Sequence, residues 1–141
     1  MLRRTGLKRG NSQIKKSPLR RMGPVGKANI RSSRIVSKMA AEMGICTCEI
    51  RLNGCTRRRF LTTAHRHDRR WYDGIVELLS HIDQWVIGCT SCHERIEHDK
   101  ELTKKVFKRL RGRENEDKIT AIRKDSQERG RQEVLDKSKQ L

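Results

Sequence analysis

The residues best suited to chemistry are cysteines and histidines, and all of them fall in one window of the chain. Five cysteines and five histidines lie between Cys46 and His98 of the 141 residues. A first group of cysteines occupies positions 46–55, and a second forms the Cys89-Thr-Ser-Cys92 sequence. A Cys-x-x-Cys knuckle supplies two thiolates to one metal ion, and two cysteine pairs complete the tetrahedral sulfur shell that zinc favours. The spacing therefore predicts a structural Zn²⁺ site.

The first group offers three thiols for two positions in that shell. Cys48 and Cys55 are the preferred pair, because Asn53-Gly54 supplies a tight turn that folds Cys55 back toward Cys48. Cys46 is the competing ligand, and it becomes a spare buried thiol if Cys48 binds. The predicted zinc ligands are Cys48, Cys55, Cys89 and Cys92. The alternative is a set of reduced, unligated cysteines.

Short elements must position these side chains. Apolar residues at four-residue steps predict helices, and runs of β-tolerant residues predict strands. The predicted elements are a helix over 30–43, a strand over 60–67, a short helix over 74–82, a second strand over 84–88, and a helix from 92 onward that continues or restarts near 99. After Gly112 the chain is highly charged, which fits either a solvated helix or a mobile tail.

Composition and charge set the fold class and the partners. Only 33% of the residues are hydrophobic and 4% aromatic, so a small core needs a staple such as a metal. The net charge is +17, and residues 1–40 hold 12 Lys and Arg with no acid, a surplus that attracts polyanions. We expect an α+β fold with a small zinc-stapled core, flanked by helices and by basic, partly disordered tails. The expected segments are a basic flexible arm (1–29), a zinc domain with flanking helices (30–112) and a charged helical or mobile tail (113–141).

The chain has neither an apolar stretch long enough for a membrane span nor the apolar region of a secretory signal. The sequence therefore predicts a cytoplasmic protein without a membrane partner. In that compartment, cysteines are metal ligands or free thiols rather than disulfide partners.

Between the cysteine pairs lies Ala64-His65-Arg66-His67-Asp68-Arg69-Arg70, and His93 directly follows Cys92. This order of a cysteine pair, a strand with histidine, a helical insert, a second strand and Cys-x-x-Cys-His resembles zinc-containing HNH endonucleases, particularly small phage-encoded ones. The resemblance covers about residues 46–98. It implies a ββα-metal (HNH) core and, for a phage-encoded protein, a location in the host cytoplasm.

The resemblance also implies catalytic roles. His65 is expected to be the general base, and His93 to bind a catalytic Mg²⁺ or Mn²⁺ ion. His67 is expected to contact phosphate, bind metal or exchange roles with His65. Gln84 stands where the family has the middle Asn of its name. Glu97, one helical turn after His93, could supply an acidic ligand.

Arginines flank the expected base and favour contacts with the DNA backbone. They are Arg57, Arg58, Arg59, Arg66, Arg69 and Arg70. The leading interpretation is thus a metal-dependent DNA endonuclease or nickase, for which cutting both strands would need a homodimer or two visits. The alternative is a non-catalytic zinc module that binds nucleic acid and recruits protein partners. Ala64, at a position where the family often has a metal ligand, and Gln84 favour that alternative.

Overall fold

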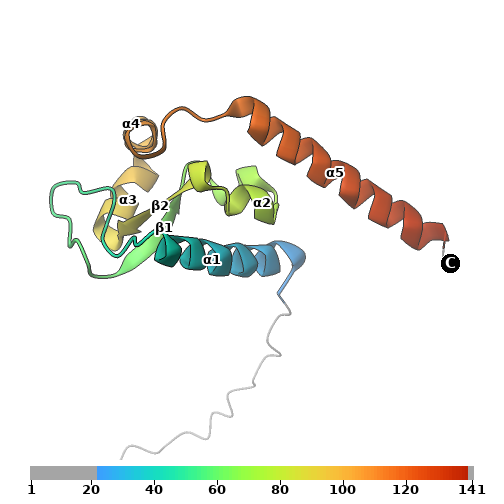
Figure 1. Cartoon of the computed structure of the whole chain (residues 1–141), viewed down its shortest axis with the longest axis horizontal. Coiled ribbons are helices and arrows are strands. Elements are labelled where there is room, and N and C mark those ends of the chain that lie inside the picture. The colour runs from blue at the N-terminus through green and yellow to red at the C-terminus, as the bar shows by residue number, and fades with distance from the viewer. Residues whose placement is uncertain (1–21, 140–141) are drawn as a thin grey trace, which may run out of the picture.

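The computed structural model of the chain describes residues 22–139 and contains a two-stranded sheet surrounded by helices (Figure 1). Its elements in chain order are α1 (Pro24–Glu42), β1 (Leu61–His65), the 3₁₀ helix η1 (Arg69–Tyr72), α2 (Val76–Leu79), the 3₁₀ helix η2 (Ile82–Gln84), β2 (Trp85–Cys89), α3 (Thr90–His98), α4 (Lys100–Arg111) and α5 (Glu116–Lys139). This mixed architecture confirms the predicted α+β class.

Strands β1 and β2 are antiparallel, with Leu61 opposite Cys89 and His65 opposite Trp85. Helix α3 begins at Thr90, immediately after β2, and packs against both strands. The two strands and this helix therefore form a compact ββα unit. Side chains alternate between the faces of a strand, so Thr62 and Ala64 share one face of β1 while Thr63 and His65 share the other.

Apolar residues cover both faces of the small sheet. On one face, Val36 and Ala40 of α1 pack against Trp85 and Ile87 of β2. The other face contacts a second cluster, which joins the cysteine loop to α3 and α4. Its buried members are Cys48, Ile50, Ala64, Val86, Cys89, Cys92, Ile96, Val106 and Phe107. The sheet thus lies between α1 and the α3–α4 pair, with cysteines inside the second core.

Helix α1 begins earlier than the sequence pattern predicts. It starts at Pro24 rather than near residue 30, and Pro24 occupies the first turn. Proline is favoured there because its fixed φ suits a helix and its missing N–H has no helical partner. The boundary of the basic arm at residue 29 is therefore too late. The rest of that predicted arm, residues 1–21, lies outside the described residues.

The helix predicted over 74–82 is instead one turn of α2 between two 3₁₀ turns. Asp73 and Gly74 both have positive φ, 50° and 70°, so the chain reverses before α2 can begin. Extended backbone at His81 ends the helical run, and its ring accepts a hydrogen bond from the Asp83 N–H to start η2. Local turn chemistry therefore overrides the apolar periodicity of this segment.

The C-terminal part is helical. Asp99 ends α3 and caps α4, since its carboxylate accepts a hydrogen bond from the Leu102 N–H. Beyond Gly112, helix α5 contacts the body through the buried Ile119 and then extends away from it (Figure 1). Of the two alternatives for this segment, the structure has the helix. No helix within residues 22–139 combines the length and hydropathy needed to cross a lipid bilayer.

Candidate metal centre and histidine site

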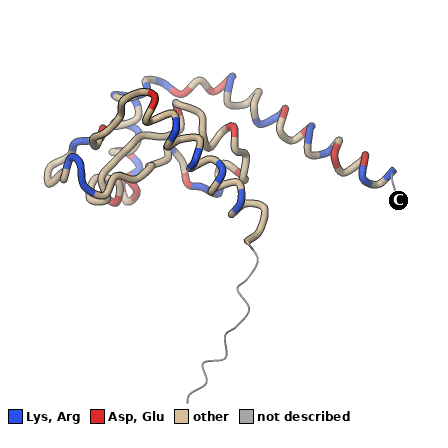
Figure 2. Tube along the Cα trace, turned by 60° about the horizontal axis from the view of Figure 1, so that its bottom comes forward, with Lys and Arg blue, Asp and Glu red and all other residues tan. Residues whose placement is uncertain are grey.

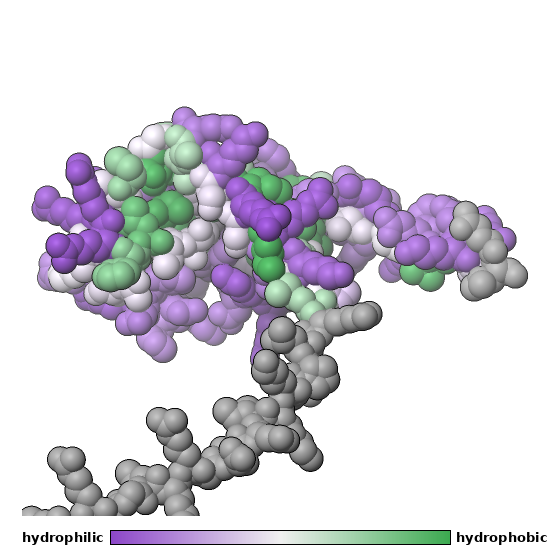
Figure 3. Space-filling view, turned by 90° about the horizontal axis from the view of Figure 1, so that it is seen from below, coloured by the Kyte–Doolittle hydropathy of each residue, from purple (hydrophilic) through white to green (hydrophobic). Residues whose placement is uncertain are grey.

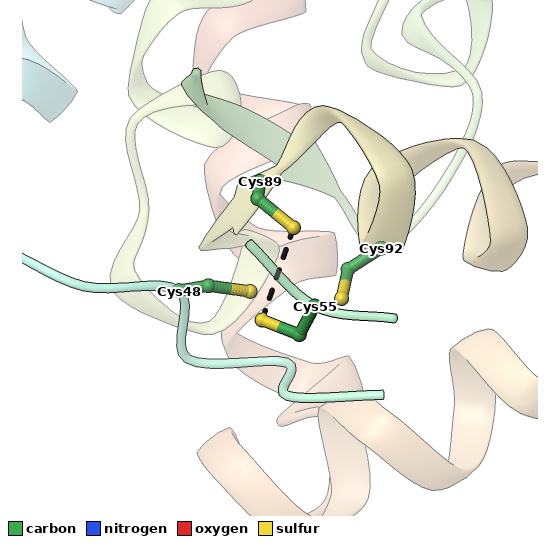
Figure 4. Close-up of side chains that lie close together, drawn as sticks. All are labelled: Cys48, Cys55, Cys89 and Cys92. Atoms are coloured by element: carbon green, nitrogen blue, oxygen red, sulfur yellow. Dashed lines mark hydrogen bonds between the residues drawn. The ribbon is translucent and has the colours of Figure 1, made fainter. Parts of the chain in front are cut away.

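Four cysteine side chains from three segments converge on one point (Figure 4). The sulfurs of Cys48, Cys55, Cys89 and Cys92 all lie within 4.8 Å of one another, and those of Cys55 and Cys89 are 3.9 Å apart. A tetrahedral zinc site with Zn–S bonds of about 2.3 Å requires sulfurs about 3.8 Å apart. The four cysteines are therefore positioned to bind a metal ion, and thiolate chemistry makes structural Zn²⁺ the fitting occupant.

The loop before β1 builds half of this centre. The Cys55 N–H donates to the Leu52 carbonyl (3.0 Å), and Gly54 adopts φ 80°, which closes the predicted turn at Asn53-Gly54. The Arg57 N–H then donates to Sγ of Cys55 (3.3 Å), a contact that stabilises a thiolate. Cys48, not Cys46, joins the cluster. Cys46 is exposed, so the expectation that it would be a buried thiol is wrong.

The thiols of the cluster differ in acidity. Burial opposes ionisation of Cys89, yet hydrogen bonds from the Cys92 backbone and from Thr56 lower its pKa to about 6. Burial raises the pKa of Cys92 to about 12, and hydrogen bonds with neighbouring cysteines act in the same direction. Four clustered thiolates repel one another, so a divalent cation must displace protons to complete the sulfur shell.

The centre is anchored to the rest of the fold. Glu49 accepts hydrogen bonds from the Ile87 N–H (2.7 Å) and from the Arg111 guanidinium (3.0 Å), which ties the cysteine loop to β2 and α4. Gly88 allows Ile50 to lie against β2, because a Cβ there would overlap Cδ1 of Ile50. These contacts fix the loop that carries Cys48 and Cys55 relative to β2, which carries Cys89.

His65 lies at the end of β1 and is largely buried. Its Nε2 is 3.2 Å from the Leu79 carbonyl, and its ring meets the Tyr72 ring edge-on with centroids 5.5 Å apart. A carbonyl only accepts, so Nε2 carries the hydrogen of the neutral ring and Nδ1 is the nitrogen that can take a proton. Burial, together with the smaller effects of the nearby charges of Arg69 and His93, lowers the pKa of His65 to about 4. His65 is therefore neutral at physiological pH.

His93, on the first turns of α3, is oriented by β1. Its Nδ1 is 2.8 Å from Oγ1 of Thr62, and the Thr62 hydroxyl donates in turn to the Gly88 carbonyl (3.3 Å). Because the hydroxyl hydrogen is directed at Gly88, Thr62 accepts from Nδ1–H of His93. The Nε2 lone pair of His93 is then free to bind a cation, which is the arrangement typical of metal-ligating histidines.

His67 and Gln84 belong to a different group of side chains. Nε2 of His67 lies 2.9 and 3.1 Å from the two carboxylate oxygens of Glu114, and the Gln84 amide donates to the same carboxylate (2.8 Å). Gln84 is fully buried and also accepts from the Tyr72 hydroxyl (3.1 Å). Trp71 stacks on the His67 ring with centroids 4.1 Å apart. His67 and Gln84 thus link the end of β1 to the segment after α4 through the Glu114 carboxylate.

Glu114 is a charged residue of this group that the sequence analysis does not single out. Burial opposes its charge, but hydrogen bonds from His67 and Gln84 lower the pKa of the carboxyl. Glu97, by contrast, is exposed on the turn of α3 that follows His93. Within residues 22–139, the four cysteines are the one group of three or more His, Cys, Asp or Glu side chains whose ligand atoms converge.

The six arginines that the sequence predicts to contact the DNA backbone fall into two classes. Five of them are exposed on the loop before β1 or on η1: Arg57, Arg58, Arg59, Arg69 and Arg70. Arg66 is different, because its guanidinium donates to the Gly112 carbonyl (3.0 Å) and lies 5.1 Å from the Phe107 ring centroid. Arg66 therefore links the end of β1 to α4, whereas the other five arginines present their side chains to solvent.

Comparisons of the chain with family models, with curated proteins and with solved structures found no match.

Proposed function

We propose that this protein is a zinc-stapled, metal-dependent DNA endonuclease or nickase of the HNH type. The observation that supports the proposal is the ββα unit, in which a neutral histidine lies at the end of β1 and an oriented histidine lies on α3. The cysteine cluster lies at the base of the same unit, where β2 joins α3. A rigid support of this kind is what a catalytic pair of side chains needs.

His65 is the proposed general base. Its buried, neutral ring presents Nδ1 as the proton acceptor, since the Leu79 carbonyl occupies Nε2. In the proposed reaction, a water oxygen bonds to the scissile phosphorus while its proton passes to His65. The bond from phosphorus to the 3′ oxygen breaks and the leaving oxygen takes a proton from a second water, so the products carry a 5′ phosphate and a 3′ hydroxyl.

His93 has the properties of a ligand for a catalytic divalent ion. Its Nε2 is unoccupied by any hydrogen bond in the described residues, and Glu97 on the next turn adds a carboxylate. An Mg²⁺ or Mn²⁺ ion bound there would neutralise charge at the phosphate and on the leaving oxygen. Thr62 acts as a positioning residue, because it fixes the ring orientation of His93 from β1.

A plasmid assay tests the proposal. Purified protein is incubated with supercoiled DNA and Mg²⁺ or Mn²⁺, and the open-circular product is quantified. We expect nicking by the wild type and a loss of about 100-fold or more in His65→Ala, in line with typical general-base contributions. His98→Ala is the matched control, because His98 is exposed at the end of α3 and should leave nicking unchanged. Equal nicking by wild type and His65→Ala would overturn the assignment.

One observation favours a second function. Ala64 is the β1 residue that shares the face of Thr62, and it is buried without a ligand atom. A chain that cannot complete a catalytic ion site would act as a zinc module that binds nucleic acid and recruits partners. Tight, salt-sensitive DNA binding without nicking at any divalent-ion concentration would select this function over the nuclease.

A further inference from the structure

Helix α1 carries a line of basic side chains on its outer face. Lys27, Arg31, Arg34 and Lys38 follow one another at steps of four, three and four residues, so they share one side of the helix. All four are exposed, and the buried residues of the helix, Ser32, Val36 and Ala40, lie on the opposite side. We refer to these four cations as the α1 stripe. At 1.5 Å per residue it is about 16 Å long.

Acidic side chains do little to neutralise the α1 stripe. The only acid in the helix is Glu42 at its end, which lies 3.9 Å from Lys38 with both side chains well exposed. Such a pair contributes little attraction in water. Lys27, Arg31 and Arg34 form no ion pair within residues 22–139. Figure 2 shows the basic positions following one another along the helix.

The α1 stripe is continuous with the histidine site. Arg34 and Arg69 line the same surface hollow, together with Ser33 and Ser37. Arg69, on η1, is close enough to His65 for its positive charge to lower the pKa of that ring. A basic path therefore runs from the outer face of α1, across this hollow, to the end of β1.

From this path, and resting on the proposed function, we infer that the α1 stripe binds the phosphate backbone of duplex DNA and guides it to His65. Exposed arginines and lysines in a row suit closely spaced phosphates, and the Ser37 hydroxyl in the hollow adds a hydrogen-bond donor. The stripe makes contacts with the backbone and reads no bases. It lies outside the arginine clusters at 57–59 and 69–70, apart from its junction with Arg69.

An anionic membrane fits this surface less well. A helix that lies in a membrane turns its apolar face toward the lipid. The apolar face of α1 is already occupied, because Val36 and Ala40 pack against Trp85 and Ile87 of the sheet. From below the molecule, hydrophilic side chains project beside smaller apolar areas rather than around one broad apolar surface (Figure 3).

The test measures DNA binding in a His65→Ala background, so that bound DNA is not cut. The stripe variant combines Lys27→Gln, Arg31→Gln, Arg34→Gln and Lys38→Gln. The control variant removes the same number of exposed charges from α5: Lys124→Gln, Arg131→Gln, Lys137→Gln and Lys139→Gln. Affinity for a short duplex is measured over a range of salt concentrations. Thermal unfolding and zinc content establish that each variant is folded, and Arg31→Gln with Arg34→Gln replaces the fourfold variant if it is not.

We expect the slope of log affinity against log salt to fall by about three to four for the stripe variant, and by about two for the double variant, because each phosphate that is no longer neutralised lowers the slope by about 0.9. The control should change the slope by less than one. Equal slopes in the stripe and control variants overturn the inference. The inference is also overturned if the stripe variant loses binding to phosphatidylserine vesicles while its DNA affinity is unchanged. The proposed nuclease fails separately, through absence of nicking by the wild type.

Discussion

The Thr62 hydroxyl on β1 lies 2.8 Å from Nδ1 of His93 on α3, so a strand side chain fixes the orientation of the candidate metal-binding histidine. The same hydroxyl donates to the Gly88 carbonyl of β2 (3.3 Å). One side chain therefore connects all three elements of the ββα unit. Groups that orient a ligating histidine usually matter almost as much as the ligand itself.

Thr62→Val tests this relationship. Valine keeps the shape and strand preference of threonine but removes the hydroxyl. We expect the Mg²⁺ or Mn²⁺ concentration for half-maximal nicking to rise by about 10- to 100-fold, because Nδ1 of His93 loses its partner. Titration of the divalent ion in the plasmid assay measures this directly.

Thr63→Val is the matched control, because Thr63 points to the opposite face of β1 and makes no contact with His93. Its ion dependence should match that of the wild type. If both valine variants need the same ion concentration as the wild type, Thr62 does not orient a metal ligand.

The zinc centre predicts different outcomes for two neighbouring cysteines. Cys48→Ser should lower bound zinc well below one ion per chain and destabilise the fold, because the ligand shell loses one of four thiolates. Cys46→Ser should retain about one zinc per chain and an unchanged unfolding temperature, because Cys46 is exposed outside the cluster. Elemental analysis and thermal unfolding measure both. Equal zinc contents in the two variants would contradict the four-cysteine assignment.

Local spacing was sufficient to predict the metal centre. The Asn53-Gly54 turn and the Cys-x-x-Cys sequence each determine the position of a cysteine pair through backbone geometry over a few residues. The two strands and the preference for Cys48 followed from the same local signals. The short helices between the strands did not, because Asp73 and Gly74 interrupt a regular apolar pattern by adopting positive φ.

Long-range partners had no such signal. Glu114 lies 47 residues from His67 and 30 from Gln84 along the chain. It stands in a highly charged segment, where an additional acidic residue does not indicate a buried partner. The role of Arg66 was equally hidden, since an arginine in a basic run gives no indication of its packing against Phe107. Sequence pattern therefore predicted the two strands, the longer helices and the candidate metal ligands, whereas the contacts that link β1 to the segment after α4 required the folded chain.

The low pKa of His65 makes stability depend on pH. The pKa is about 4 in the folded protein and 6.5 in the unfolded chain, so the unfolded chain binds more protons between these values. His65 thus contributes stability that is complete above about pH 6.5 and is lost as the pH falls toward 4. The lost free energy of unfolding should be about 2 to 3 kcal/mol.

His65→Gln removes this titration while the zinc centre remains. Between pH 7 and pH 4, the free energy of unfolding of the wild type should fall by about 2 to 3 kcal/mol more than that of His65→Gln. Loss of zinc at low pH affects both proteins and largely cancels in the difference. A pH-independent difference would show that the His65 ring is not held neutral by burial.

The contact between His67 and Glu114 distinguishes the two histidines of the β1 segment. His67→Gln should retain nicking within about threefold of the wild type, since His67 is bound to a carboxylate, whereas His65→Gln should lose about 100-fold or more. Glu114→Ala should lower the free energy of unfolding by about 1 to 3 kcal/mol, because the buried Gln84 amide loses its acceptor.

Two further variants sharpen this prediction. Glu114→Gln keeps an acceptor oxygen and should recover part of the lost stability. Glu116→Ala should have no effect, because Glu116 is exposed on the first turn of α5. The plasmid assay and chemical denaturation separate the two roles, catalytic for His65 and structural for the His67–Glu114 pair. If His67→Gln abolished nicking in a protein of unchanged stability, His67 rather than His65 would be the base.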